Sequence, residues 1–270
     1  MPSLRILVTG ATGFLGGPVV AAVRAAGHVA CTTARSGGDA AVDLTAPGMV
    51  DAVCQALRPD VVVHLAAMSS IAACEREPER AHVVNALLPE RLAERFGARL
   101  LTVSTDLVFD GARAPYAATS PPAPKSVYGA TKAEGEERVR AHGGRVVRVP
   151  LLFGQDARGR GASASLRQAL SGSAPVVLFP NEYRTPLHAA DVARALTALV
   201  VDPDGPGLLH LAGPERVSRW QFGLRFCAAH GLPVSRLVAA DCADPLRPRD
   251  VSLVGEWQAG RSLDAMLADC

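Results

Sequence analysis

The sequence has almost no lysine. It contains 28 basic residues, and only two of them, Lys125 and Lys132, are lysine, which leaves 26 arginines. Because arginine supplies nearly every positive charge in this chain, a remaining lysine can serve a purpose that needs a compact ammonium. The net charge of +2 and the lack of a long basic run argue against nucleic acid or an acidic membrane surface as a partner.

Paired cysteines and long apolar runs are also missing. The six cysteines are widely spaced, without a C-x-x-C motif or a His pair at metal-ligand spacing. This argues against a disulfide framework, and no metal site is expected. No apolar stretch approaches the roughly 20 residues needed to cross a bilayer, and the N-terminal MPSLRILVTG leads directly into a predicted strand. The simplest expectation is a cytoplasmic protein with no membrane partner.

Apolar strand-like segments alternate with helix-like segments in the first half of the chain. The predicted strands cover residues 4–9, 28–34, 60–66, 100–104 and 145–149. The predicted helices cover residues 14–26, 49–57, 72–96 and 126–142, and Pro78 and Pro89 mark breaks or helix starts within the third of these regions. Continuous apolar strands that alternate with helices indicate a doubly wound α/β domain, a Rossmann-type fold with a parallel sheet covered on both faces.

The alternating pattern loosens after Phe153. Residues 154–172 are rich in Gly, Arg and Ser, and Pro and Gly recur further along the chain, which is typical of a smaller, partly interleaved region. We assign residues 1–154 to a dinucleotide-binding domain and residues 155–270 to a C-terminal substrate domain. A predicted helix and strand within residues 186–212 are candidates to rejoin the first domain.

A glycine-rich turn follows the first predicted strand. It reads GATGFLGG, and its glycines follow a G-x-x-G-x-x-G pattern. Such glycines permit a tight turn, a close approach of backbone to a pyrophosphate, and close helix–strand packing. The helix that follows offers N–H groups and a positive dipole end to the phosphates. The predicted cofactor-binding residues of this turn are Gly10, Thr12, Gly13, Phe14, Leu15 and Gly16.

Tyr128 and Lys132 stand four residues apart in SVYGATKAEGEE, residues 126–137. On a helix these positions share one face, so the phenol and the ammonium are expected to point into one pocket. A tyrosine with a pKa of about 10 is a poor acid or base near neutrality, and a nearby cation lowers that pKa. The pair therefore predicts acid–base chemistry that uses one of only two lysines in the chain.

The stretch STDLVFDG, residues 104–111, places Ser104, Thr105 and Asp106 where a buried strand ends. Such an exit can present a hydroxyl to a ligand. An alternative role for Asp106 is to cap the turn that follows.

These motifs carry a family resemblance. GATGFLGG, HLAA at 64–67, STDLVFDG and YGATK together resemble an extended short-chain dehydrogenase/reductase. Within that superfamily, STDLVFDG and NEYRTPLHAADVA at 181–193 are most similar to the dTDP-4-dehydrorhamnose reductase group. That group also contains the regulatory β subunit of methionine adenosyltransferase. The resemblance covers almost the whole chain and is weaker over residues 155–180 and beyond about 215.

The resemblance implies catalytic roles for Thr105, Tyr128 and Lys132. Thr105 would orient a substrate carbonyl, Tyr128 would protonate its oxygen, and Lys132 would bind the nicotinamide ribose. Ser104 would lie beside the cofactor, and Asp106 would contact substrate. Sugar-nucleotide dehydratases of the superfamily carry Thr-Asp-Glu here, whereas this chain has Leu107 after Asp106. Dehydration is therefore not expected.

Further positions follow from the same resemblance. Asp43 and Leu44 resemble the pair that contacts the adenine ring, and an ordinary loop aspartate is the alternative. Ala66 and Ala67 are small enough to leave room for the cofactor at a strand end. Asn85 either supports the active-site network or caps a helix.

Arginines are the predicted anion-binding residues. Arg184, in NEYRTPLH, would suit a substrate diphosphate because its planar fork matches phosphate oxygens, and a surface arginine is the alternative. Further candidates for an anionic clamp are Arg158, Arg160, Arg247 and Arg249. Strand 28–34 ends at Arg35 with no acid until Asp39, which favours NADPH over NADH because Arg35 can pair with a 2′-phosphate. The alternative is that Arg35 is a solvated loop residue and that both cofactors are used.

The expected activity is NAD(P)H-dependent reduction of a keto group, at C4, on a nucleotide-activated deoxysugar. One alternative is a non-catalytic dinucleotide-binding regulatory subunit, and another is a ketoreductase for a non-sugar substrate in specialised metabolism. The expected partner is a small nucleotide sugar, and a homodimer is left open.

Overall fold

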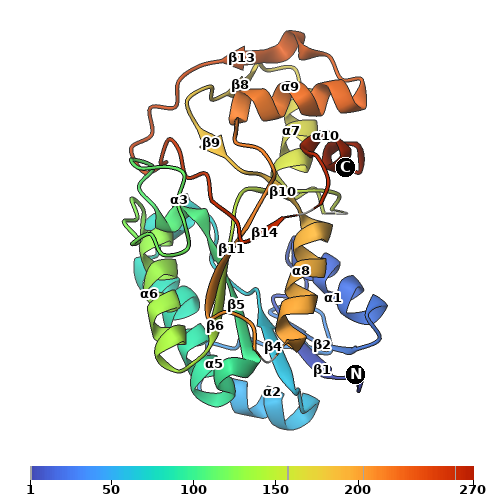
Figure 1. Cartoon of the computed structure of the whole chain (residues 1–270), viewed down its shortest axis with the longest axis vertical. Coiled ribbons are helices and arrows are strands. Elements are labelled where there is room, and N and C mark those ends of the chain that lie inside the picture. The colour runs from blue at the N-terminus through green and yellow to red at the C-terminus, as the bar shows by residue number, and fades with distance from the viewer. Residues whose placement is uncertain (1, 157, 203, 259) are drawn as a thin grey trace.

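The structure is a computed structural model that describes residues 2–156, 158–202, 204–258 and 260–270. Within these residues, its centre is an eight-stranded parallel sheet (Figure 1). The strands, in order across the sheet, are β14 (Trp257–Gln258), β11 (Leu208–Ala212), β6 (Arg145–Val149), β5 (Leu100–Thr105), β4 (Val61–His64), β1 (Arg5–Thr9), β2 (Val29–Ala34) and β3 (Ala40–Ala41).

The sheet is doubly wound. The chain runs from β1 outward to β3, returns to the centre at β4, and continues in the opposite direction through β5 and β6. The order therefore reverses between β1 and β4, and the crevice at the carboxyl ends of these strands is the usual ligand site of such sheets. The prediction of a Rossmann-type fold is confirmed.

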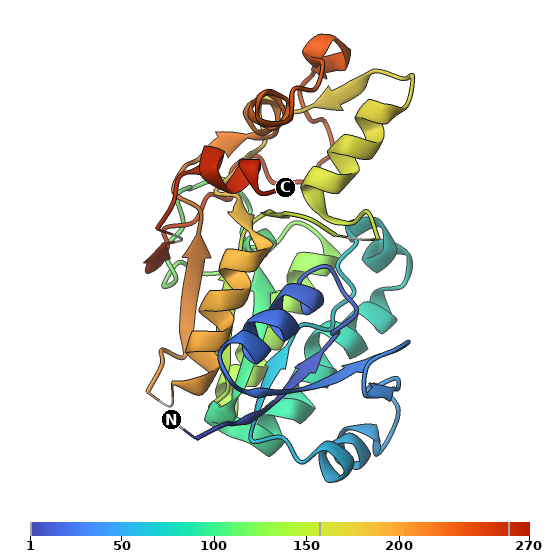
Figure 2. The same ribbon diagram turned by 90° about the vertical axis from the view of Figure 1, so that its right-hand side faces the viewer.

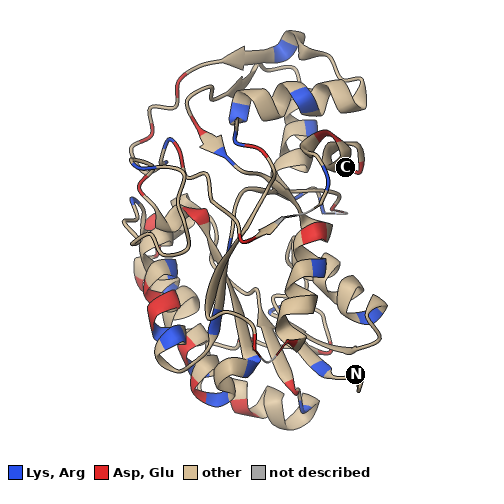
Figure 3. Ribbon diagram, in the orientation of Figure 1, with Lys and Arg blue, Asp and Glu red and all other residues tan. Residues whose placement is uncertain are grey.

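Helices cover both faces of the sheet (Figures 1 and 2). The covering helices are α1 (Gly16–Ala25) and α8 (Ala189–Val201) on one face, and α2 (Met49–Leu57), α5 (Leu88–Phe96) and α6 (Val127–Ala141) on the other. A hydrophobic core lies on each face of the sheet, and alternate strand residues belong to different cores. Ile6 and Val8 pack toward α1, and Leu7 packs toward α2. The helix α6 carries both basic and acidic residues along its length (Figure 3).

The predicted helix over residues 72–96 is divided in the structure. It consists of α3 (Ile71–Arg76), α4 (Pro78–His82), a π-helical turn over Val83–Leu87, and α5. Pro78 is the first residue of α4, where the missing proline N–H leaves no helical hydrogen bond unmade. Pro89 follows the π-helical turn closely, inside a helical backbone that continues from Pro78 to Phe96. The π-helical turn carries Asn85, and such turns are frequent at functional sites.

A smaller region lies beyond the carboxyl ends of the central strands, in the upper part of Figure 1. Its helices are α7 (Gly161–Ser171), α9 (Arg219–His230) and α10 (Leu263–Ala268). Its strand pairs are β7 (Leu152–Phe153) with β10 (Leu187–His188), β9 (Tyr183–Arg184) with β12 (Val217–Ser218), and β8 (Val176–Leu178) with β13 (Leu237–Ala239). Phe153, Phe222 and Phe226 of this region belong to the same hydrophobic core as α1 and α8.

The chain returns to the central sheet late in the sequence. After β10, α8 packs against α1, and β11 pairs with β6. The short strand β14 then extends the sheet beyond β11, an addition that the sequence pattern did not indicate. Among the described residues, no helix has the length and hydropathy that would suit a membrane span.

Candidate active site

A cavity of about 920 Å³ opens at the carboxyl ends of β1, β2, β4 and β5. It extends from the glycine-rich turn to the start of α9. The residues that the sequence assigned to cofactor binding and catalysis, together with Asp106 and Arg184, all line this cavity. They are Gly10, Thr12, Gly13, Phe14, Leu15, Gly16, Arg35, Asp43, Leu44, Ala66, Ala67, Ser104, Thr105, Asp106, Tyr128, Lys132 and Arg184.

Two glycines of the glycine-rich turn, Gly10 and Gly16, have no space for a Cβ. Gly10 adopts a φ of 65°, and a Cβ there would lie 2.8 Å from the backbone nitrogen of Ala66. A Cβ at Gly16 would overlap the carbonyl group of Ala11. The turn therefore keeps backbone exposed at the N-terminus of α1, which is the cradle that a dinucleotide's pyrophosphate requires. The residues present fit such a cofactor.

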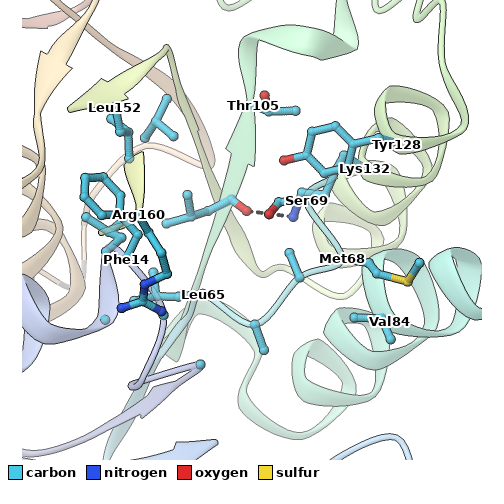
Figure 4. A pocket seen from close by; sticks show the side chains of 18 of the residues that line it. Phe14, Leu65, Met68, Ser69, Val84, Thr105, Tyr128, Lys132, Leu152 and Arg160 are labelled. Carbon is cyan, nitrogen blue, oxygen red and sulfur yellow. Dashed lines mark hydrogen bonds between the residues drawn. The ribbon is translucent and has the colours of Figure 1, made fainter. Parts of the chain in front are cut away.

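Tyr128 and Lys132 project from the first two turns of α6 toward the cavity (Figure 4). The hydroxyl of Ser126 caps this helix by accepting a 3.2 Å hydrogen bond from the backbone N–H of Gly129. A Cβ at Gly129 would overlap the carbonyl oxygen of Leu107. The glycine of the YGATK motif thus lets the start of α6 approach the exit of β5, where Thr105 lies.

Burial governs the protonation of both residues. Burial raises the pKa of Tyr128, and the Thr105 hydroxyl acts in the opposite direction. Burial lowers the pKa of Lys132 to about 8, although Glu136 opposes this shift. The ammonium donates a 2.7 Å hydrogen bond to the carbonyl oxygen of Val103 (Figure 4). The prediction that Lys132 lowers the pKa of Tyr128 is wrong for this structure, because desolvation of the phenol dominates.

Thr105 ends β5 and caps the turn that follows. Its hydroxyl accepts a 3.2 Å hydrogen bond from the N–H of Leu107 and donates one of 3.2 Å to Asp106 Oδ1. Thr105 therefore performs the capping that had been considered for Asp106. Asp106 is buried instead, and this burial raises its pKa to about 6 while Arg184 opposes the shift.

Arg184 is buried on β9, which rules out the alternative of a surface loop arginine. Each of its three nitrogens faces a protein acceptor. Nε lies 3.4 Å from Asp106 Oδ2, and Nη2 lies 3.3 Å from Glu182 Oε1. Nη1 donates to the backbone oxygens of Tyr183 at 2.7 Å and Pro248 at 3.4 Å. Diphosphate binding by Arg184 stays a prediction.

Sequence reasoning missed two residues at this end of the cavity, Glu182 and Arg219. The Glu182 carboxylate is buried and accepts hydrogen bonds of 2.8–3.0 Å from Arg247. Arg219 Nε lies 4.0 Å from Glu182 Oε1. The only available signal was the position of Glu182 inside NEYRTPLH, two residues before Arg184, because nothing local distinguishes Arg219.

The other arginines named from the sequence separate into two groups. Arg158 and Arg160 line the cavity and donate to the carbonyl oxygen of Thr12 at 3.3 and 2.6 Å, so they contact the glycine-rich turn. Arg247 also lines the cavity. Arg249 does not line it and donates to the backbone oxygen of Arg247 at 3.0 Å.

The far end of the cavity contains the residues expected near the adenosine part of a cofactor. Asp43 is held by Thr45, whose N–H and hydroxyl donate to it at 2.9 and 2.6 Å and lower its pKa. Arg35 lies at the cavity just after β2. Asp39 turns back onto β2, where its Oδ2 accepts from the N–H of Thr32 at 2.8 Å, and it does not line the cavity.

Asn85 links three parts of the site. Its amide accepts from Met68 N–H at 2.9 Å and donates to Met68 O at 3.0 Å and to Thr131 Oγ1 at 3.1 Å. It therefore ties the loop after β4 to α6, which carries Tyr128. Among the described residues, no group of three His, Cys, Asp or Glu side chains is arranged to hold a metal ion.

The sheet order and the cavity at the carboxyl ends of its strands define a doubly wound, Rossmann-type α/β protein. The family model for the RmlD substrate binding domain matches residues 4–253, so the chain belongs to that family.

Relatives of two kinds are similar to this chain. It is 33% identical over 267 residues to dTDP-4-dehydrorhamnose reductase of Mycobacterium tuberculosis (strain CDC 1551 / Oshkosh), covering 93% of this chain and 80% of that protein. It is 32% identical over 262 residues to methionine adenosyltransferase 2 subunit beta of Xenopus laevis, covering 88% and 75%. The crystal structure of dTDP-4-dehydrorhamnose reductase from Bacillus anthracis, in complex with NADP, shares the fold with a TM-score of 0.89 at 22% identity and 98% coverage of both chains.

Proposed function

We propose that the protein is an NAD(P)H-dependent reductase that reduces a keto group, at C4, on a nucleotide-activated deoxysugar. The observation that carries this proposal is the convergence of Thr105, Tyr128 and Lys132 on one wall of a cavity that also contains the glycine-rich turn. The Mycobacterium tuberculosis relative supports the reaction class, and the NADP complex of the Bacillus anthracis enzyme supports the cofactor.

The cofactor would lie along the cavity from Asp43 and Leu44 to Lys132. The glycine-rich turn would bind its pyrophosphate, and Arg35 would pair with a 2′-phosphate. Ala66, Ala67 and Ser104 lie near the strand ends where the nicotinamide half would fit. When bound, the cofactor supplies the hydride.

Residues of the protein would deliver the proton to the substrate oxygen. Because burial raises the pKa of Tyr128, its phenol stays protonated near neutral pH and is ready to donate to a carbonyl oxygen. Thr105 would turn its hydroxyl proton, which it donates to Asp106 Oδ1 in this structure, toward that oxygen and fix its position. Lys132 would orient the nicotinamide ribose, since its ammonium already stands at the cavity wall beside Val103.

A second candidate function is a regulatory subunit that binds dinucleotide without turnover. The observation that favours it is the similarity to methionine adenosyltransferase 2 subunit beta. The arrangement of Tyr128 and Lys132 favours the reductase, although a fold alone would favour neither.

NADPH oxidation against a panel of dTDP-4-keto-6-deoxysugars separates the two candidates. We expect oxidation with at least one member, and its loss in Tyr128→Phe. Clear NADPH binding without oxidation on any member would contradict the reductase and favour the regulatory function.

A further inference from the structure

Three guanidinium groups surround two carboxylates at the substrate end of the cavity. We refer to Asp106, Glu182, Arg184, Arg219 and Arg247 as the arginine cluster, and all five line the cavity. With every group ionised, the cluster carries one positive charge in excess. Asp106, Glu182 and Arg184 are buried, whereas the side chains of Arg219 and Arg247 are 21% and 35% exposed, so the excess positive charge lies at the cavity and is suited to an anionic ligand.

The three arginines differ in how many donors they have left. Each nitrogen of Arg184 lies next to an acceptor. Arg247 donates hydrogen bonds to the Glu182 carboxylate through Nε and Nη2. Arg219 has its Nη1 fully buried, with no hydrogen-bond partner in the part of the chain that the structure describes. Its nearest carboxylate contact is the 4.0 Å approach of Nε to Glu182, which is too long for a hydrogen bond.

The backbone holds Arg219 in this position. Arg219 is the first residue of α9, and its N–H donates a 2.8 Å hydrogen bond to the carbonyl oxygen of Glu182. Ser218 and Gln221 close a capping box around the same helix start. The positive end of the α9 dipole adds to the attraction for an anion at this point. Burial lowers the pKa of Arg219 to about 10, so the guanidinium stays charged near neutral pH.

We propose that Arg219 is the residue that binds the diphosphate oxygens of the substrate, while Arg184 positions Asp106 and Glu182. The inference deepens the proposed function and rests on it for the identity of the substrate as a nucleotide sugar. The cofactor also carries a pyrophosphate, so the two sources must be separated. Arg219 belongs to the substrate end, because it is linked through Glu182 and Arg184 to Asp106, the neighbour of Thr105.

Calorimetric titration of dTDP, and separately of inorganic pyrophosphate, into protein saturated with NADP⁺ tests the proposal without turnover. Saturation keeps the glycine-rich turn occupied. We expect Arg219→Met to weaken dTDP binding by about tenfold or more, since it removes charged hydrogen bonds. Arg219→Lys should recover part of this loss, and the NADP⁺ affinity should stay unchanged in both variants.

The matched control is Arg225→Met. Arg225 lies on the same helix, pairs with Glu215 and Asp264, and does not line the cavity. It should bind dTDP as the wild type does. Arg219→Met should unfold in urea at the wild-type midpoint or above it, because Glu182 keeps its contacts to Arg184 and Arg247.

Two results would overturn the proposal. One is unchanged dTDP affinity in Arg219→Met and Arg219→Lys. The other is a loss of NADP⁺ binding equal to the loss of dTDP binding, which would assign Arg219 to the cofactor. If Arg219→Met weakens dTDP binding but the wild type oxidises no NADPH, the diphosphate-binding role of Arg219 is supported and only the reductase function is contradicted.

Discussion

The two ends of the cavity differ in the groups that line them. At the cofactor end, backbone groups and glycines shape the surface, and Gly10 and Gly16 have no space for a Cβ. At the substrate end, the arginine cluster provides paired side-chain charges on segments far apart in the sequence. A backbone site depends on local sequence, whereas a charge network depends on how distant segments pack. The cofactor end can therefore be predicted from a short motif, and the substrate end cannot.

The largest expected effect is on stability, and it distinguishes Arg184 from Arg219 within the arginine cluster. Arg184→Met removes the partner of buried Asp106 and one partner of Glu182, and breaking a buried pair costs about 3 kcal/mol or more. We expect the free energy of unfolding in urea to fall by about that amount, in contrast to Arg219→Met. Unchanged stability together with a tenfold higher KM would instead support the prediction that Arg184 binds diphosphate.

The second effect is on turnover and concerns Tyr128. Tyr128→Phe keeps the ring and its packing but removes the proton donor, so turnover should fall by about 10²-fold or more. The Kd for NADPH, measured by fluorescence titration, should stay unchanged. Near-normal turnover in this variant would show that another group donates the proton.

The third effect is the pH dependence of stability through Asp106. Its folded-state pKa of about 6 lies above the usual value of 3.8, so the folded protein holds a proton that the unfolded chain has lost between these values. The stabilisation from this group is therefore complete below pH 3.8 and is lost as the pH rises through about 6. Across that window, the stability of the wild type relative to Asp106→Asn should fall by about 2 kcal/mol.

Urea unfolding of both proteins at several pH values measures this difference. A wild type that gains stability relative to Asp106→Asn as the pH rises would mean that Arg184 lowers the pKa of Asp106 more than burial raises it.

The smallest effect is at the adenosine end. If Arg35 pairs with a 2′-phosphate, wild-type kcat/KM should favour NADPH over NADH, and Arg35→Ala should reduce that preference by about tenfold. Asp39, which turns back onto β2, supplies no competing carboxylate at the cavity. Equal use of both cofactors, unchanged in the variant, would leave Arg35 without this role.

The sequence predicted the central fold well because apolar strands and helical periodicity are local signals. Met49–Leu57 and Arg145–Val149 agree with the predicted boundaries. Pro78 and Pro89 marked breaks or helix starts within residues 72–96, and Pro78 does begin α4, whereas the π-helical turn over Val83–Leu87 has no sequence signal of its own. The edge strand β14 is too short to carry a pattern of its own.

The candidate site was predicted where a motif carries its own geometry. Tyr128 and Lys132 share a helix face, so their spacing in the sequence was enough to predict that both side chains reach the same cavity. Their pKa values could not be predicted, because burial rather than mutual charge determines them. Glu182 and Arg219 were missed because their roles arise only when β9 and the start of α9 meet.

Transfer of deuterium from the nicotinamide ring of deuterated NADPH tests the central claim most directly. Each dTDP-4-keto-6-deoxysugar is incubated with the protein and the deuterated cofactor, and the sugar is analysed by mass spectrometry and NMR. The account predicts that one substrate gains a single deuterium on the former carbonyl carbon, and that Tyr128→Phe lowers the rate of this transfer by about 10²-fold. Tight binding of NADPH without deuterium in any sugar would contradict the account.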